Sequence, residues 1–166
     1  YDDSWRRDYD LTLDLYTNLM ETQYLNGNMA ELPHHLEYIN KHVQNPIHAL
    51  SAYEISIQSL SAQQELNEAA DLGLTYLKKL GLSFPDKTNK IQSLLAIIRM
   101  SSLMAFKKPE ELYQLPEMTD QRALAIMNIF KATATAFYLG GSPFLPLYIL
   151  RGLKVTLKYG NSPSSV

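Results

Sequence analysis

The chain has 166 residues and no cysteine, and its 15 Lys plus Arg against 17 Asp plus Glu give a net charge of −2. This length is enough for one domain with a sizeable core, and the lack of cysteine excludes disulfides, cysteine-ligated zinc and thiol nucleophiles. The slightly acidic balance provides no overall positive field for a phosphate backbone, so we expect no nucleic-acid partner. A cysteine-free chain suits a cytoplasmic location.

The first half of the chain predicts four helices, paired as two helical hairpins. Residues 9–26 pair with 29–44, and residues 46–63 pair with 65–80. In each helix, apolar or small residues recur every three or four positions and therefore share one face. These residues are Leu13, Tyr16, Met20 and Tyr24; Leu32, Leu36, Ile39 and Val43; Leu50, Tyr53, Ile57 and Leu60; and Leu66, Ala69 or Ala70, Gly73, Leu77 and Leu80.

Three further helices are predicted after Pro85, in a less regular half. The first starts at Ile91, ends near 107–109 and is expected to be buried, because residues 91–106 contain Arg99 and are shorter than the roughly 20 residues that span a bilayer. The second is capped by Thr119. The third is opened by Ser142 and Pro143 and runs to Tyr159. The predicted buried residues of the second helix are Ala123, Ile126, Met127, Phe130, Ala134 and Phe137.

These seven helices predict an all-α fold of stacked antiparallel hairpins. We expect a single domain over 1–166, with two regular hairpins over 9–81 and a less regular three-helix half over 86–160. Hairpins of this kind bury their apolar faces by stacking on neighbours, and a helix at the end of the stack leaves its outer face exposed.

The two ends of the chain suggest a piece of a longer protein. Gly160 suits the left-handed position that stops a helix, while Ser162 and Pro163 suit the start of another. Tyr1 is not an initiator methionine. We therefore expect an open C-terminal end, and self-association through it is one expected consequence.

No catalytic or cofactor-binding motif occurs in the sequence. It has no phosphate loop, dinucleotide turn, HExxH pair or nucleophile elbow, so we expect a chain without catalysis, cofactor or metal. Glu31 and His34 form one Glu-x-x-His unit, whereas di-iron bundles use two with further carboxylates. His34 and His35 are expected to face solvent, and His42 and His48 are expected to be surface or capping residues.

Two groups of residues are candidates for binding. Arg151, Lys154 and Lys158 recur at spacings of three and four, which gives either a basic partner surface or the solvated face of the last helix. A methionine and aromatic set could line a pocket for a small apolar ligand in the second half, although such residues more often fill a core. That set is Met100, Met104, Met127, Phe130, Phe137 and Phe144.

Five segments carry a resemblance to a known family. They are WRRDYDLTLDLY (5–16), YLNGN (24–28), LKKLGLSFP (77–85), LPEMTD (115–120) and LKYGNSP (157–163). In their order and spacing the chain resembles the helical-repeat region of very large bacterial signalling proteins. In that family a serine/threonine kinase domain is followed by an AAA-like P-loop ATPase, tetratricopeptide-like repeats, a GAF sensor and often a histidine kinase.

The resemblance implies a fold, a position and a role. The fold would be a tetratricopeptide-like right-handed α-solenoid, placed between the ATPase and the sensor of a parent serine/threonine or histidine kinase that uses ATP. The chain itself would be a non-catalytic scaffold or relay, making protein contacts within or between molecules. The alternative from the residues is a self-contained helical domain that binds a small apolar ligand in its second half. No functional residue of the family carries over.

Overall fold

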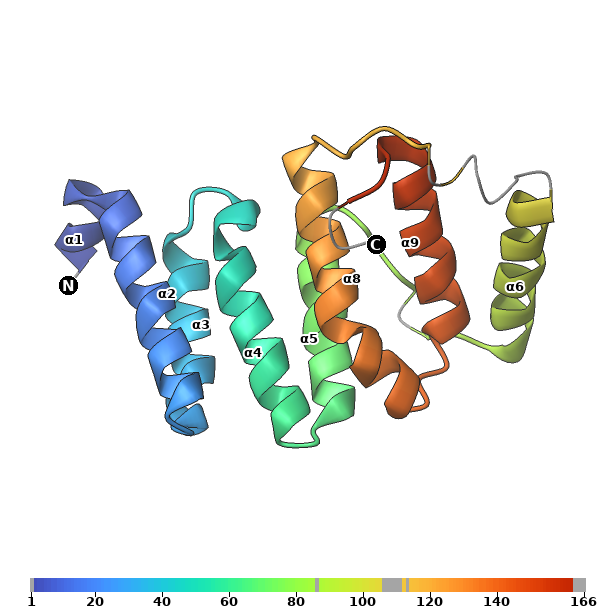
Figure 1. Ribbon diagram of the computed structural model, residues 1–166. Coiled ribbons are helices and arrows are strands. Elements are labelled where there is room, and N and C mark those ends of the chain that lie inside the picture. The colour runs from blue at the N-terminus through green and yellow to red at the C-terminus, as the bar shows by residue number, and fades with distance from the viewer. Residues whose placement is uncertain (1, 86, 106–111, 113, 163–166) are drawn as a thin grey trace.

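The computed structural model describes residues 2–85, 87–105, 112 and 114–162, and it confirms the all-α prediction (Figure 1). Within these residues the only pairing of strand type is an isolated bridge between Glu117 and Asn161. The helices are α1 (Asp2–Arg7), α2 (Tyr9–Leu25), η1 (Met29–Glu31), α3 (Leu32–His42), η2 (Pro46–Ala49), α4 (Leu50–Ala62), α5 (Leu66–Lys79), α6 (Lys90–Ala105), α8 (Gln121–Leu139) and α9 (Leu145–Tyr159).

Local capping sets the ends of several helices. Asp120, and not the predicted Thr119, caps α8, because its side-chain Oδ1 accepts a hydrogen bond from the Ala123 N–H at 2.7 Å. Ser142 lies before α9, where its Oγ accepts from the Phe144 N–H in a turn. Gly160 ends α9 with φ of +99°, as predicted, in a conformation that a side chain disfavours.

The N-terminal helix α1 was not predicted from the sequence. It packs against α2 and α3 through Trp5, whose side chain is 6% exposed. The indole ring stacks on His42 at 5.1 Å and on Tyr16 at 5.9 Å between ring centroids. This aromatic contact holds a helix of only six residues, which is too short to be stable alone in water.

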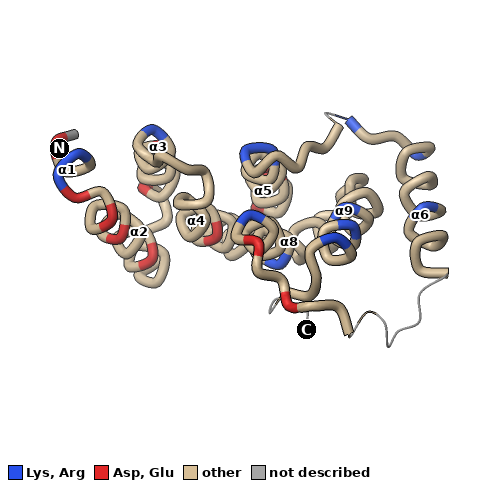
Figure 2. Tube along the Cα trace, turned by 90° about the horizontal axis from the view of Figure 1, so that it is seen from above, with Lys and Arg blue, Asp and Glu red and all other residues tan. Residues whose placement is uncertain are grey.

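The order of the helices in space differs from their order in the sequence. The hairpins α2–α3 and α4–α5 lie side by side, α8 packs on both α4 and α5, and α9 packs on α8 (Figures 1 and 2). Helix α6 packs on the other side of α9, at the end of the molecule. The exposed end is therefore formed by α6, and not by the last helix as expected.

One continuous core runs through both halves, from Met20 on α2 to Val155 on α9. The stripes predicted for α3, α4 and α5 supply much of it. At its centre the rings of Tyr53 and Tyr76 stack at 4.0 Å, and the Tyr76 hydroxyl donates to the Pro46 carbonyl at 2.7 Å. Because α8 contacts both helices of the second hairpin, the core has no break between the halves.

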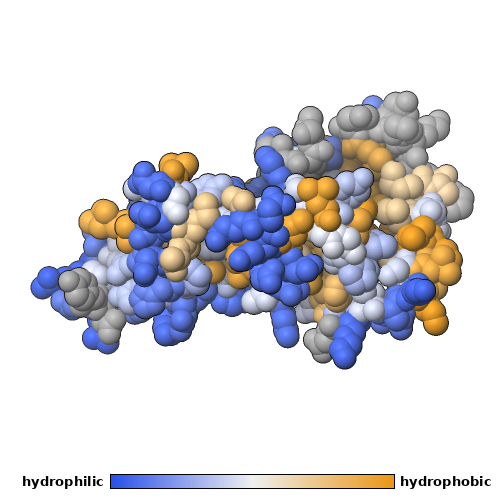
Figure 3. Space-filling view, turned by 90° about the horizontal axis from the view of Figure 1, so that it is seen from below, coloured by the Kyte–Doolittle hydropathy of each residue, from blue (hydrophilic) through white to orange (hydrophobic). Residues whose placement is uncertain are grey.

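The prediction that the Ile91 helix is buried is wrong. Ala96 is the buried residue of α6, whereas Ile91 is 68% and Leu94 57% exposed. The small Ala96 side chain lies on the opposite side of the helix from the apolar stripe and lets α6 approach α9. The stripe of Ile91, Leu94, Leu95 and Ile98, here called the α6 outer face, points away (Figure 3).

The apolar side of α8 was predicted only in part. Ala123, Ile126, Phe130 and Phe137 are buried as expected, but Ala134 is exposed. Four residues that were not predicted are also buried, because α8 is covered by α4, α5 and α9 and not by a single neighbour. These residues are Ala125, Ile129, Thr133 and Ala136.

Candidate protein-binding cleft

A cleft of about 680 Å³ lies between α3 and α5 and has α4 as its floor. Both flanking helices lie on the same side of α4 (Figure 2). The cleft forms because the two hairpins contact each other through α2 and α4, and through α3 and α4, while α3 and α5 stand apart. It is referred to below as the α3–α5 cleft.

The floor and lower walls of the α3–α5 cleft are apolar. Leu36 comes from α3, Tyr53 and Leu60 from α4, and Leu72 from α5. Tyr53 is held by its stack on Tyr76 and by the hydrogen bond that its hydroxyl donates to Asn40 Oδ1 at 3.3 Å. The apolar surface is therefore fixed in place before any partner arrives.

Polar contacts close one end of this cleft. The Lys79 ammonium on α5 donates to Asn40 Oδ1 on α3 at 2.8 Å and lies 5.4 Å from the centre of the Tyr53 ring. These contacts join the two walls where both helices end. At the other end the lining residues are Met29 and Gln63, in the turns that connect each hairpin.

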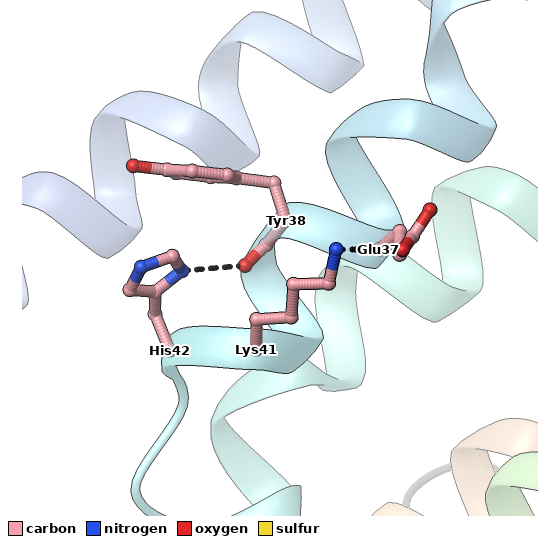
Figure 4. Close-up of polar contacts among 4 residues, drawn as sticks. All are labelled: Glu37, Tyr38, Lys41 and His42. Atoms are coloured by element: carbon pink, nitrogen blue, oxygen red, sulfur yellow. Dashed lines mark hydrogen bonds and ion pairs between the residues drawn. The ribbon is translucent and has the colours of Figure 1, made fainter. Parts of the chain in front are cut away.

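The rim of the cleft is acidic. Glu37 lies on the α3 wall, and Glu68 and Asp71 lie on the α5 wall. Glu37 forms an ion pair with Lys41, one helical turn away, with 2.7 Å between Glu37 Oε1 and Lys41 Nζ (Figure 4). This hydrogen bond and the lysine charge lower the pKa of the Glu37 carboxyl. Glu68 and Asp71 are exposed and give the α5 wall its negative charge.

The four histidines have structural positions outside this cleft. His42 Nδ1 lies 2.8 Å from the Tyr38 carbonyl oxygen at the end of α3 (Figure 4), and His48 Nδ1 lies 2.7 Å from the Tyr9 hydroxyl. His34 is exposed as predicted, but His35 is half-buried. Burial, followed by the charge of His34, lowers the pKa of His35.

The described residues contain neither a metal-binding cluster nor a membrane-spanning helix. No group of three or more His, Cys, Asp or Glu side chains is close enough there to hold a metal ion, and Glu31 and His34 form no such group. Among the described helices, none combines the length and the apolar character needed to cross a membrane.

A second, smaller cleft is lined by the basic residues that were predicted on the last helix. Arg151, Lys154 and Lys158 surround a space of about 330 Å³ together with Arg122 from the start of α8. Sequence reasoning missed Arg122, because a helical repeat links residues along one helix and contains no signal that joins the start of α8 to α9. The structure thus brings the predicted stripe together and adds a fourth cation.

Four of the six residues proposed for a ligand pocket in the second half pack in the core instead, while Met100 and Met104 lie half-buried on α6. Phe130 and Phe137 are 7% and 0% exposed, and their rings lie 4.3 and 4.1 Å from that of Tyr148. Met127 and Phe144 are half-buried against the same core. These contacts fill the space between α8 and α9, which is the core alternative of the sequence analysis.

No protein-family model, no curated protein and no solved structure matches this chain.

Proposed function

We propose that the chain is a non-catalytic helical scaffold that binds a segment of a protein partner in the α3–α5 cleft. The observation that carries the proposal is the fixed apolar floor between two parallel helical walls, with charged residues at the rim. Apolar grooves between helices accept amphipathic helices, whose anchor residues enter the groove while polar residues stay at the rim. Clefts of this size are also within the usual range for ligand sites.

The rim indicates the chemistry of the partner. Glu68 and Asp71 place two carboxylates on the α5 wall, and Lys79 is occupied with Asn40 at the closed end. A segment with an apolar face and flanking Lys or Arg residues therefore complements the cleft, because charge complementarity favours such a partner and disfavours an acidic one.

The resemblance supports a cellular setting for this scaffold. We propose that it is a scaffold or relay in a cytoplasmic multidomain signalling kinase, between an ATPase and a sensor domain. The continuous core from α2 to α9 would transmit a shift at one end to the other. The α6 outer face offers a further contact, through which copies of the chain would self-associate.

The test uses a synthetic amphipathic peptide with a leucine face flanked by lysines, and a twin with glutamates in place of the lysines. Fluorescence anisotropy should show that the lysine peptide binds the intact chain about tenfold more tightly. The variant Asp71→Lys should remove this preference, because it cancels the negative charge that Glu68 and Asp71 give the α5 wall.

The matched control is Asp14→Lys, which makes the same charge change at an exposed position on α2, outside the cleft. It should leave both affinities unchanged. The proposal is wrong if neither peptide binds, or if Asp14→Lys and Asp71→Lys have equal effects.

A further inference from the structure

Four cationic side chains from two helices line the small cleft beside the last turns of α9. Arg151, Lys154 and Lys158 lie along α9, and Arg122 comes from the first turn of α8. Figure 2 shows the Lys and Arg residues of α9 close to the start of α8. The turn at Gly81 and Leu82 forms the third side of this space of about 330 Å³. It is referred to below as the basic cleft.

Acidic side chains do not balance this charge. Among the described residues that line the basic cleft, Asp120 is the single carboxylate. Its Oδ1 is already engaged, because it accepts from the Ala123 N–H at 2.7 Å at the positive end of α8. Within the described part of the chain, no ion pair involves any of the four cations. The cleft is therefore positive in a chain whose net charge is −2.

One of the four cations is held in a fixed orientation. Arg122 Nε donates to the Leu80 carbonyl oxygen. Its guanidinium covers Gly81 so closely that a Cβ atom at that position would overlap a terminal nitrogen. A guanidinium is planar, and two of its N–H groups can donate to two oxygens of one phosphate group. The hydrogen bond through Nε holds this planar group in one orientation beside the cleft.

We propose that the basic cleft binds a phosphate monoester carried on a protein side chain. A compact dianion matches four cations gathered around one small space. An extended phosphodiester chain would not fit within a space of about 330 Å³ and would reach beyond the cleft, whereas a single phosphate group fits inside it. The apolar residues Leu82 and Val155 line the same space and would contact the carbon atoms of the ester.

This site is separate from the α3–α5 cleft, so the inference goes beyond the proposed function and does not depend on it. It also explains the basic stripe more fully than a solvated helix face does. A solvated stripe needs no residue from another helix, whereas here Arg122 is anchored beside it.

The experiment measures anisotropy with labelled short peptides of neutral residues that carry one phosphoserine or one phosphotyrosine, each with an unphosphorylated twin. The intact chain should bind at least one phosphopeptide about tenfold or more tightly than its twin. Inorganic phosphate should compete for the bound phosphopeptide. Equal affinity for both phosphopeptides and their twins would overturn the proposal.

Variants distinguish a site from general attraction. Lys154→Gln should weaken phosphopeptide binding about tenfold, and because Lys154 is exposed the fold should be retained. Arg6→Gln removes the same charge on α1, at the other end of the molecule, and should change nothing. Asp71→Lys in the α3–α5 cleft should also leave this binding intact, which separates the two sites.

Two results would contradict the assignment to a phosphorylated protein. The first is an equal loss of affinity in Arg6→Gln and Lys154→Gln, which would indicate attraction by overall charge. The second is tighter binding of single-stranded DNA, or of vesicles with anionic lipids, than of the phosphopeptides. Arg122→Lys provides a further readout: it keeps the charge but loses the planar fork, and should weaken binding while circular dichroism remains unchanged.

Discussion

Gly73 on α5 lies directly against Thr133 on α8, so closely that a Cβ atom on Gly73 would overlap the Thr133 methyl carbon. Both residues are buried, and Thr133 is 0% exposed. The absence of a side chain at position 73 therefore sets how closely α5 and α8 approach. This contact joins the second hairpin to the rest of the core.

The first prediction concerns this contact. Gly73→Ala should lower the free energy of unfolding by about 1–2 kcal/mol, because overpacking costs about 1–3 kcal/mol and the better helix propensity of alanine returns up to about 1 kcal/mol. Thr133→Ser removes the methyl group and keeps the hydroxyl. Urea unfolding of the double variant should show most of the Gly73→Ala cost relieved. If Gly73→Ala lowers the free energy of unfolding equally in the parent chain and in the Thr133→Ser variant, the two residues do not interact.

The second prediction concerns the buried hydroxyl of Tyr148, which fixes α9 on α8. It donates to the Phe130 carbonyl at 2.6 Å and lies 2.6 Å from Thr133 Oγ1. Burial raises the pKa of Tyr148 far above its ordinary value, so the group stays neutral. Tyr148→Phe should cost about 1–3 kcal/mol, because the buried Phe130 carbonyl and Thr133 hydroxyl lose their contacts with the Tyr148 hydroxyl. The control is Tyr138→Phe, at a ring that is 72% exposed. Thermal unfolding should show a loss of stability for Tyr148→Phe and little change for Tyr138→Phe.

The third prediction is a pH dependence from Glu54 on α4. Burial raises the pKa of its carboxyl above the ordinary 4.5, and the charge of Lys131 lowers it in part. The folded state therefore holds the proton more tightly than the unfolded state, and this contribution to stability declines as pH rises above 4.5 through the folded pKa.

Glu54→Gln removes this dependence, since the amide stays neutral. The variant should be more stable than the parent at about pH 7, and the difference should shrink toward about pH 4. Urea unfolding at several pH values measures it. A difference that does not change with pH would contradict the assigned cause.

The fourth prediction concerns the α6 outer face. Leu94→Glu should leave the unfolding free energy within about 0.5 kcal/mol of the parent, because Leu94 is 57% exposed. The same change should reduce any self-association measured by light scattering, since it places charge in an apolar patch. A loss of several kcal/mol would show that Leu94 is buried in solution.

Helix type and approximate extent could be predicted from the sequence, because the stripes on α3, α4 and α5 have a clear helical period. The placement of α6 could not. Its stripe is as regular as the others, but periodicity shows that an apolar face exists and not which neighbour covers it. Packing through Ala96 turned the stripe outward.

Both clefts were beyond the reach of sequence reasoning for the same physical reason. The α3–α5 cleft exists because two helices stand apart, and the basic cleft exists because Arg122 lies beside a helix that is distant in the sequence. Three of its cations were visible as the stripe of Arg151, Lys154 and Lys158. Their convergence with Arg122 depends on how α8 packs against α9.

Hydrogen exchange can show directly whether the α3–α5 cleft receives an apolar, basic segment. The intact chain is measured with and without the lysine-flanked amphipathic peptide. We predict new protection of the amides of α3 and α5, on the two walls of the cleft, and little change in α6. Protection confined to α6 or α9, with α3 and α5 unchanged while the peptide is bound, would mean that the α3–α5 cleft is not the binding site.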